Sequence, residues 1–429
     1  MNDPLLRELA LPCGAVLPNR IAKAAMTEGL ASMAGVPRPE LDRLYGLWSD
    51  GGAGLLISGN IQVDRDHLER PGNVIIDGAP DAELEAALSR WARSATRGGN
   101  HFWAQLSHAG RQTPKRVNPR PGAPSAVPLG LPGGQFGEPV ELAAAEIENI
   151  VTRFGIAAAA CKRAGFTGIQ VHGAHGYLLS QFLSPRTNQR SDRYGGALEN
   201  RARVLLDAVR AVRDAVGPEF PVAVKLNSAD FQRGGFDFDE SLQVAQWLEQ
   251  AGIDLIEISG GTYEQPKLVG IAGLEDEEPQ AVRQSTRLRE AYFVDFAIAM
   301  HEKVSVPLMV TGGLRTRAVM EQVLRDGSAD VIGIARPMCL DADAPRQLFA
   351  GAESLTRYED GLSALPRWLA FLERSDTVRV FAGLSLMYWW YAQIDELARH
   401  GVARPRMPAV AAALRVLRQQ AALLRQRPA

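Results

Sequence analysis

The sequence predicts a (β/α)8 barrel, the TIM-barrel architecture, followed by a C-terminal helical extension. Short β-type runs alternate with helical stretches, and strict alternation is typical of a parallel sheet. Eight such units lie between Asn19 and Arg336, which is the number that closes a barrel. After Leu355 the pattern changes to helices only. We therefore expect a barrel domain over residues 1–350 and an extension over 351–429 that packs on the barrel or lies at an oligomer interface.

The expected strands are short runs of apolar or β-branched residues that end in glycine or polar residues. Gly54–Ser58, for example, is continuously apolar, as expected for a strand buried on both faces. A short hairpin at Leu9–Val16 is expected before the first strand. In chain order the predicted strands are Asn19–Ala25, Gly54–Ser58, His101–Ser107, Ile169–Val171, Pro221–Asn227, Asp254–Ile258, Pro307–Thr311 and Asp330–Ile334.

The expected helices show apolar residues at helical spacing between the strands. Leu41 and Leu44 lie on one face of the first helix, which Gly51-Gly52 ends, and Asp81 is the expected N-cap of the second. The predicted helices are Pro39–Ser49, Asp81–Arg97, Glu141–Arg163, Asn200–Val216, Asp239–Gln250, Leu288–Glu302, Arg317–Arg325 and, in the extension, Pro408–Gln426.

Composition and charge narrow the classes of partner. The chain has 429 residues, 46% of them hydrophobic and 22% charged, with a net charge of −2. This balance gives no reason to expect nucleic acid or an anionic membrane as a partner. The scattered Cys13, Cys161 and Cys339 argue against a zinc ribbon, a cysteine-held iron–sulfur cluster and a disulfide framework. With no signal-peptide pattern and no apolar run long enough to span a bilayer, we expect a cytoplasmic protein.

The last two strands end in residues that suit a phosphate. Gly312-Gly313 follows strand seven, and Ala335-Arg336 follows strand eight. The loops after these strands of a (β/α)8 barrel commonly bind phosphate through backbone N–H groups, and Arg336 adds a charged donor. Two tight turns with a solvent-facing arginine are the plainer alternative. We favour a phosphate site, and at this point the phosphate can belong to a substrate or to a cofactor.

Polar residues on strands three and five are the next candidates. By alternation, Gln105 and Lys225 point towards the barrel mouth. An amide that donates and accepts, together with a positive charge, suits a heterocycle that gains negative charge on reduction, such as a flavin. Thr27, after strand one, can add a hydroxyl. Each of these residues alone also fits a satisfied polar group inside a barrel or a turn.

The stretch Gly168–Gly196 carries the strongest indication of a catalytic site. His172, His175 and Tyr177 follow strand four within six positions, at the strand end where (β/α)8 barrels keep their chemistry. A single histidine or tyrosine here would be explained by packing, but three polar rings favour a site. The rest of the stretch is expected to be loop, as is the Pro- and Gly-rich segment Asn118–Glu138.

Sequence motifs spread over the barrel, from about Leu11 to Asp343, carry a family resemblance. They are Asn19-Arg-Ile, Ala25-Met-Thr27, Gln105-Leu-Ser-His-Ala-Gly-Arg111, Gly173-Ala-His175-Gly-Tyr177-Leu-Leu-Ser-Gln-Phe-Leu-Ser-Pro185, Asn188-Gln-Arg-Ser-Asp-Arg-Tyr-Gly-Gly196, Glu199-Asn-Arg201 and the glycine and Ala-Arg ends of the last two strands. On these motifs the chain resembles the old yellow enzyme family of FMN-dependent ene-reductases, within the wider group of NADH:flavin oxidoreductases.

The resemblance implies bound FMN, NADPH or NADH as the electron donor, and an activated alkene as the substrate. A hydride would pass from NAD(P)H to flavin N5 and then to the β-carbon of an α,β-unsaturated carbonyl. His172 and His175 would hold the carbonyl oxygen, and Tyr177 would protonate the α-carbon. The residues that it assigns to FMN are Ala25, Met26, Thr27, Gly59, Gln105, Lys225, Gly312, Gly313, Ala335 and Arg336.

The implied roles of the FMN residues differ. Thr27 would tune the reduction potential by a hydrogen bond, and Gly59 would lie against the ring. Gln105 would bind the pyrimidine part, and Lys225 would stabilise the anionic reduced flavin at its N1/O2 edge. The glycine and Ala-Arg ends of strands seven and eight would hold the phosphate.

Two departures and several alternatives stay open. The family often has Pro at Ala25 and, in many members, Asn at His175. A metal-dependent barrel hydrolase or lyase with His172, His175 and His108 as ligands is the competing enzyme class, although the HxxH spacing is weak support for a metal. A family flavoprotein that acts on a non-alkene substrate, or one with an inactive site, would also fit. The aromatic run Leu384–Tyr391 most simply packs on the barrel flank, with a homo-oligomer contact as the alternative.

Overall fold

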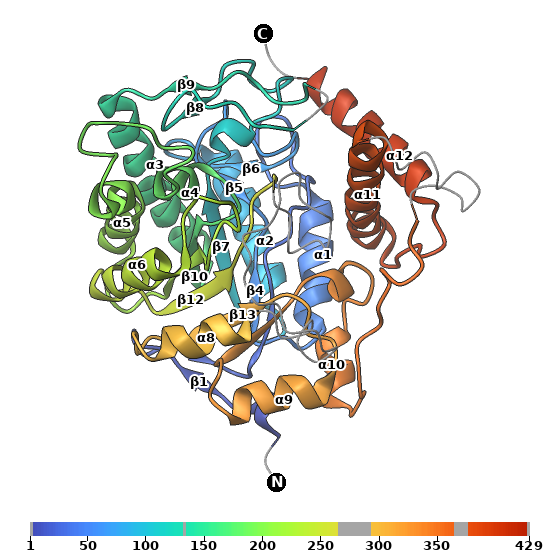
Figure 1. The fold of residues 1–429 in the computed structure, drawn as a ribbon. Helices are drawn as coiled ribbons and strands as arrows, with labels where there is room; N and C mark the ends of the chain where they lie inside the picture. The colour runs from blue at the N-terminus through green and yellow to red at the C-terminus, as the bar shows by residue number, and fades with distance from the viewer. Residues whose placement is uncertain (1–2, 132–133, 265–292, 364–375, 427–429) are drawn as a thin grey trace.

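The structure is a computed structural model that describes residues 3–131, 134–264, 293–363 and 376–426 (Figure 1). Eight parallel strands form a closed barrel, because each pairs with the next and β7 also pairs with β10. The predicted barrel is therefore confirmed. Its strands are β3 (Ile21–Lys23), β4 (Leu55–Ile57), β7 (His101–Ser107), β10 (Gly168–Gly173), β11 (Val222–Asn227), β12 (Leu255–Ser259), β13 (Leu308–Thr311) and β14 (Val331–Ile334).

Helices surround the barrel at the predicted places. The Asp81 side chain accepts from the N–H of Leu84 and begins α2, as expected of an N-cap. Gly165 ends α3 in the left-handed conformation. The outer helices are α1 (Pro39–Asp50), α2 (Ala82–Ala95), α3 (Ala144–Ala164), α5 (Leu198–Val216), α6 (Phe238–Gln250), α8 (Val294–His301) and α9 (Arg317–Arg325). The first residues of the helix predicted at Leu288–Glu302 lie outside the described residues.

Several short elements were not predicted because they are too short to show a periodic pattern. The stretch after Tyr177, expected to be loop, begins with the buried helix α4, so that part of the loop prediction is wrong. The segment Asn118–Glu138 contains a strand that pairs with β9. These elements are β5 (Ile61–Gln62), β6 (Val74–Ile75), β8 (Gly122–Ala123), β9 (Val140–Glu141), α4 (Leu178–Leu183), α10 (Ala344–Phe349) and the 3-10 helices η1 (Pro4–Leu6), η2 (Gly110–Gln112) and η4 (Arg336–Cys339).

The two ends of the barrel differ in the side chains that occupy them. The predicted hairpin, β1 (Leu9–Ala10) with β2 (Val16–Leu17), is confirmed. Its side chains form one cluster with barrel-interior residues such as Leu55, Trp103 and Met309. This cluster closes the N-terminal end of the barrel, whereas polar side chains occupy the C-terminal ends of the strands. The larger apolar core lies between the sheet and the outer helices.

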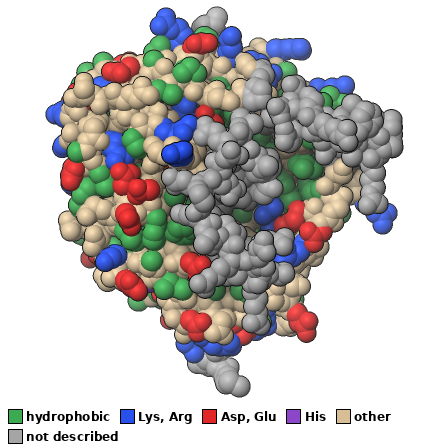
Figure 2. Space-filling model, viewed as in Figure 1, with side chains coloured by type: hydrophobic (Ala, Val, Ile, Leu, Met, Phe, Trp, Pro, Cys, Tyr) green, Lys and Arg blue, Asp and Glu red, His purple; other side chains and the backbone are tan. Residues whose placement is uncertain are grey.

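The C-terminal helices α11 (Asp376–His400) and α12 (Ala409–Leu424) lie beside α1, opposite α3, α5 and α6 (Figure 1). Arg43 of α1 donates to the carbonyl of Ala398 at 3.0 Å, and Trp389 donates to the carbonyl of Met407 at 2.7 Å. The domain boundary at residue 350 stays a prediction. Within the described part of the chain, no helix is both long and apolar enough to cross a membrane. Charged side chains of both signs are interspersed on the face shown in Figure 2.

Candidate active site

Four polar side chains form a hydrogen-bonded chain inside the barrel. Register brings Gln170 beside Gln105 and Lys225 beside Glu257. Gln105 Nε2 donates to Gln170 Oε1 at 2.7 Å, and Gln170 Nε2 donates to Glu257 Oε2 at 2.8 Å. Lys225 Nζ donates to Glu257 Oε1 at 2.8 Å. All four are buried. Sequence reasoning found Gln105 and Lys225 but missed the other two, although each interrupts an otherwise apolar strand.

The residues after β3 meet the loop between β5 and β6. Thr27 Oγ1 donates to Glu69 Oε2 at 2.6 Å, so its hydroxyl oxygen still has room to accept another bond. The sulfur of Met26 lies 3.4 Å from Cys339 Sγ. The N–H of Gly59 donates to the buried Glu28 carboxylate at 2.9 Å. Ala25 borders the cluster inside the barrel. The structure thus gathers the residues that follow the first two strands, as the sequence predicts.

Two arginines and two glycines meet after β13 and β14. Gly312 and Gly313 have φ values of 122° and 78°, which side-chain-bearing residues rarely adopt. Arg336 Nη1 lies 3.5 Å from Glu359 Oε1, and Arg315 Nη2 lies 3.0 Å from the same oxygen. Sequence reasoning missed Arg315, which is 4% exposed. Its Nε has no hydrogen-bond partner within the described part of the chain, so a buried donor is free at this end of the barrel.

The three rings after β10 converge. His172 Nε2 faces His175 Nδ1 at 3.2 Å. The ring centroids of His172 and Tyr177 are 4.8 Å apart. His175 has a φ of 62°, which is costly for a non-glycine residue. The Asn227 side chain supports this backbone by accepting from the N–H of His175 at 3.1 Å. The structure therefore brings together the three residues predicted to be catalytic, on a loop held against β11.

Neighbouring polar side chains affect which histidine nitrogens can donate. Ser107 Oγ lies 3.3 Å from His172 Nδ1, and Ser259 Oγ lies 2.6 Å from His175 Nε2. When both serines donate, the facing nitrogens His172 Nε2 and His175 Nδ1 both carry protons. At 3.2 Å the two facing nitrogens form a hydrogen bond only when one of them lacks a proton, so both can donate only when a ligand oxygen accepts from them. Asn60 lies 3.1 Å from His172 Nδ1 and can present either end of its amide to it.

Burial sets the protonation states of this group. It lowers the pKa of His172 and of His175 well below 6.5, and the charge of Lys225 lowers both further. Burial, followed by the neighbouring Tyr263 and Glu69, raises the pKa of Tyr177 well above 10. At neutral pH the histidines are uncharged donors and the tyrosine is a protonated phenol. This combination can hold a carbonyl oxygen and supply a proton.

Comparison with known proteins decides the family. The model of the NADH:flavin oxidoreductase / NADH oxidase family matches residues 14–354. The chain is 37% identical over 366 residues to the NADH-dependent flavin oxidoreductase iliE of Hypocrea jecorina, covering 80% of this chain and 88% of that one. It therefore belongs to the NADH:flavin oxidoreductase family. The family resemblance seen in the motifs is confirmed, and the protein is an NAD(P)H-dependent FMN oxidoreductase of the old yellow enzyme type.

Further proteins similar to this chain differ in their named activities. An NADH oxidase of Thermoanaerobacter brockii is 34% identical over 346 residues, 80% of this chain and 50% of that one. The old yellow enzyme homologue of Zymomonas mobilis superposes with a TM-score of 0.68 at 26% identity, covering 82% of this chain and 94% of that one. The family and its cofactor are thus shared, while the acceptor of the electrons is not given by membership alone.

The residues at the barrel mouth fit the FMN of the NADH:flavin oxidoreductase family. The free Nε of Arg315 and the left-handed Gly312-Gly313 backbone suit a phosphate. Glu359 now neutralises Arg315 and Arg336, so a phosphate would compete with this carboxylate. The amide of Gln105 suits the edge of a flavin ring.

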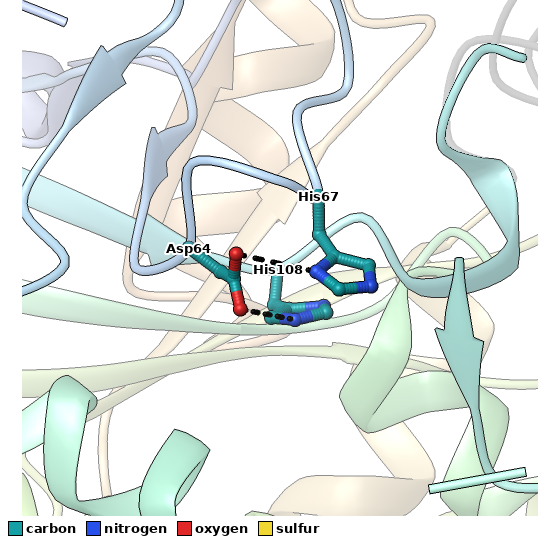
Figure 3. Close-up of side chains that lie close together, drawn as sticks. All are labelled: Asp64, His67 and His108. Atoms are coloured by element: carbon teal, nitrogen blue, oxygen red, sulfur yellow. Dashed lines mark ion pairs between the residues drawn. The ribbon is translucent and has the colours of Figure 1, made fainter. Parts of the chain in front are cut away.

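A second histidine cluster consists of Asp64, His67 and His108 (Figure 3). Asp64 Oδ1 is 3.3 Å from His67 Nδ1, and Asp64 Oδ2 is 3.7 Å from His108 Nε2. The other nitrogen of each ring accepts a backbone N–H, from Gly122 at 2.8 Å and Gly110 at 3.1 Å. The nitrogens that face Asp64 therefore carry protons, which a metal ion would have to displace.

This cluster links segments around the barrel and does not include His172 or His175. Arg153 of α3 adds a third partner to Asp64 at 2.9 Å. Burial alone would raise the pKa of Asp64, but His108 and His67 hold it well below its usual value. Grouping His108 with the facing pair as metal ligands was therefore wrong. Among the described residues, the side chains close enough together to share a metal ion are Asp64, His67 and His108, a group without His172 and His175.

Proposed function

We propose that this NADH:flavin oxidoreductase is an ene-reductase whose substrate is an activated alkene, an α,β-unsaturated carbonyl compound. The observation that carries the proposal is the arrangement of His172 Nε2 and His175 Nδ1, which face each other at 3.2 Å with the Tyr177 ring beside them. Two neutral imidazoles whose nitrogens meet at one point could both donate to a carbonyl oxygen placed there, and a protonated phenol suits the carbon next to it.

The facing histidines would polarise the substrate. A carbonyl oxygen that accepts from both N–H groups gains electron density as the alkene is reduced, and both hydrogen bonds strengthen with it. Ser107 and Ser259 would hold the two rings in the tautomer that this task needs. Since both rings are neutral, they bind an uncharged carbonyl without the desolvation cost of a buried cation.

Tyr177 would complete the reaction by protonating the α-carbon. Its hydroxyl is held by Tyr263 at 2.8 Å, and its raised pKa keeps the proton in place until a carbanion-like carbon develops. FMN, when bound, supplies hydride transfer between NAD(P)H and the alkene. We assign its ring to Ala25, Met26, Thr27, Gly59, Gln105 and Lys225, and its phosphate to Gly312, Gly313, Ala335 and Arg336.

Anaerobic single turnover tests the proposal. The flavin-loaded protein is reduced with one equivalent of NADH and mixed with 2-cyclohexenone, and flavin absorbance and cyclohexanone are measured. We expect flavin re-oxidation with one equivalent of product, and loss of both in the His172→Ala, Tyr177→Phe double variant. Tyr194→Phe, a buried tyrosine on the loop after α4, is the matched control and should behave as the wild type.

The alternative within the family is a non-alkene acceptor. The relative named as an NADH oxidase makes this the competing assignment. Re-oxidation by dioxygen alone, with no product from 2-cyclohexenone or from any other activated alkene, would favour it and would end the ene-reductase proposal.

A further inference from the structure

Arg70 is a buried arginine beside the proposed substrate site, and none of the described residues gives it a carboxylate partner. Only 7% of it is exposed. Its Nε and Nη1 are buried and have no hydrogen-bond partner within residues 3–131, 134–264, 293–363 and 376–426. A guanidinium withdrawn from water is costly unless an anion or several acceptors compensate it. The described part of the protein supplies neither to these two nitrogens.

The guanidinium lies against the backbone that follows β3. A Cβ atom at Gly29 would come within 2.7 Å of Arg70 Cζ, so Arg70 fills the space where a side chain at position 29 would be. Gly29 is two residues beyond Thr27, which the FMN assignment places next to the flavin. Gly29 has a φ of 66°, a further reason why only glycine suits this position.

The loop that carries Arg70 is held firmly in place. The N–H of Arg70 donates to Asn73 Oδ1 at 2.9 Å. Asn73 Nδ2 lies 3.4 Å from Thr27 Oγ1, and that hydroxyl donates to Glu69 at 2.6 Å. The unpartnered guanidinium is thus fixed relative to Thr27.

Tyr391 of α11 covers Arg70 from the other side. Arg70 Cζ lies 4.1 Å from the centroid of the Tyr391 ring, a cation–π contact. Tyr391 and Glu69 also contribute to raising the pKa of Tyr177, after burial and Tyr263. Through Tyr391 the C-terminal extension reaches the loop between β5 and β6, whose Glu69 accepts from Thr27 at 2.6 Å.

We propose that Arg70, beneath Tyr391, binds a carboxylate carried by the substrate. A carboxylate is a planar anion that can accept from two N–H groups along one edge of a guanidinium, through Nη2 together with Nε or Nη1, and it can lie beside an aromatic ring. The inference rests on the proposed function and narrows it: the substrates are activated alkenes in which a carboxylate stands apart from the carbonyl that His172 and His175 hold.

A binding titration tests this without turnover. The ligands are linear methyl enones in which none to three methylene groups separate the alkene from a terminal carboxylate, each paired with its primary amide. Binding to the oxidised, flavin-loaded protein is followed by the visible absorbance of the flavin. We expect at least one acid to bind about tenfold or more tightly than its amide, and this ratio to fall close to one in Arg70→Gln.

Two further variants separate a binding site from a general effect of charge or packing. Arg116→Gln removes the same charge from an exposed position and should keep the acid-to-amide ratio. Arg70→Lys keeps the charge without the planar fork and should retain part of the ratio. Flavin content and thermal unfolding are recorded for each variant.

The wild-type ratio makes the inference falsifiable even where a variant does not fold. Equal affinity of every acid and its amide for the wild type would overturn it. An equal loss of ratio in Arg70→Gln and Arg116→Gln would also overturn it. If 2-cyclohexenone is reduced but no acid binds more tightly than its amide, only the assignment of Arg70 is wrong. If acids bind selectively but no activated alkene is reduced, only the proposed ene-reductase function is wrong.

Discussion

The hydroxyl of Tyr177 lies 2.8 Å from the hydroxyl of Tyr263, which comes from the segment after β12 on another part of the barrel mouth. Tyr263 is followed by Glu264, whose carboxylate pairs with the buried Arg111 at 2.7 Å. Arg111 also donates to the carbonyl of Pro128 at 2.9 Å. Three loops that are distant in sequence thus fix the proton donor that we propose.

The first prediction concerns these two tyrosines. Tyr177→Phe should slow enone reduction by about 10²–10⁴-fold, because it removes the proton donor, and should leave flavin reduction by NADH unchanged. Tyr263→Phe should also slow enone reduction and leave flavin reduction unchanged. Its effect should be smaller than that of Tyr177→Phe, because it removes the hydrogen-bond partner of the Tyr177 hydroxyl but not the hydroxyl itself. Stopped-flow absorbance separates the two half-reactions. Equal slowing of both half-reactions by Tyr177→Phe would contradict its role as proton donor.

The second prediction is a flat pH profile for enone reduction between about pH 6.5 and 10. The folded-state pKa values of His172 and His175 lie well below 6.5, so their neutral forms persist as the pH falls past that value. The pKa of Tyr177 lies well above 10, so its proton persists on the alkaline side. Single-turnover rates at a series of pH values measure this. An inflection near pH 6.5 would show that one of the histidines titrates as if exposed.

The second prediction has a counterpart in stability, because the same pKa shifts give the direction of acid destabilisation. Since the pKa values of His172 and His175 are lower in the folded than in the unfolded chain, the unfolded chain takes up protons first as the pH falls below about 6.5. The free energy of unfolding should therefore decrease on acidification below that value. Denaturant titrations at several pH values give the free energy of unfolding of the wild type and of the His172→Gln, His175→Gln variant. If this free energy changes with pH equally in both proteins, the two histidines contribute nothing to the acid destabilisation.

A third prediction concerns the ion pair inside the barrel. Lys225→Met leaves Glu257 buried without its cation and should lower the free energy of unfolding by about 3–5 kcal/mol. The exposed Lys303→Met is the control, with an expected change within about 0.5 kcal/mol. Adding Glu257→Gln to Lys225→Met should restore part of the loss, because a neutral amide replaces the unpaired carboxylate. Urea unfolding measures all three, and equal values for the two lysine variants would refute the prediction.

The fourth prediction concerns retention of FMN. Arg336→Ala and Arg315→Ala should each weaken FMN binding by about tenfold or more, because each removes a charged donor from the proposed phosphate site. Arg418→Ala, on the exposed face of α12, serves as the control. The ratio of flavin to protein after dialysis gives the result. An unchanged ratio in Arg336→Ala would remove that residue from the site.

The barrel itself could be predicted because its pattern is local. Each strand, such as Gly54–Ser58, is an apolar run between loop residues, and each helix has its own apolar face, so neither depends on knowing the partner. The strand ends were then known to share one mouth, because parallel strands in a closed barrel all point the same way. That is why His172, Lys225 and Arg336, distant in sequence, could be assigned to one site.

The partners of those residues could not be predicted in the same way. Glu257 and Gln170 meet Lys225 and Gln105 only because the barrel closes in one register. Tyr263 reaches Tyr177 through the packing of two irregular loops, which have no periodicity to identify them. His108, which the sequence allowed as a partner of His172, turns instead to Asp64.

By itself, the sequence determined the barrel, the edge where we place the chemistry and the three rings after β10, because spacing and strand direction are properties of a single chain. The tertiary structure decided which side chains surround these rings. It placed Tyr263 on Tyr177 and brought Tyr391 of the C-terminal extension over Arg70. Contacts between distant segments depend on how the closed barrel and its loops pack, and no local pattern encodes them.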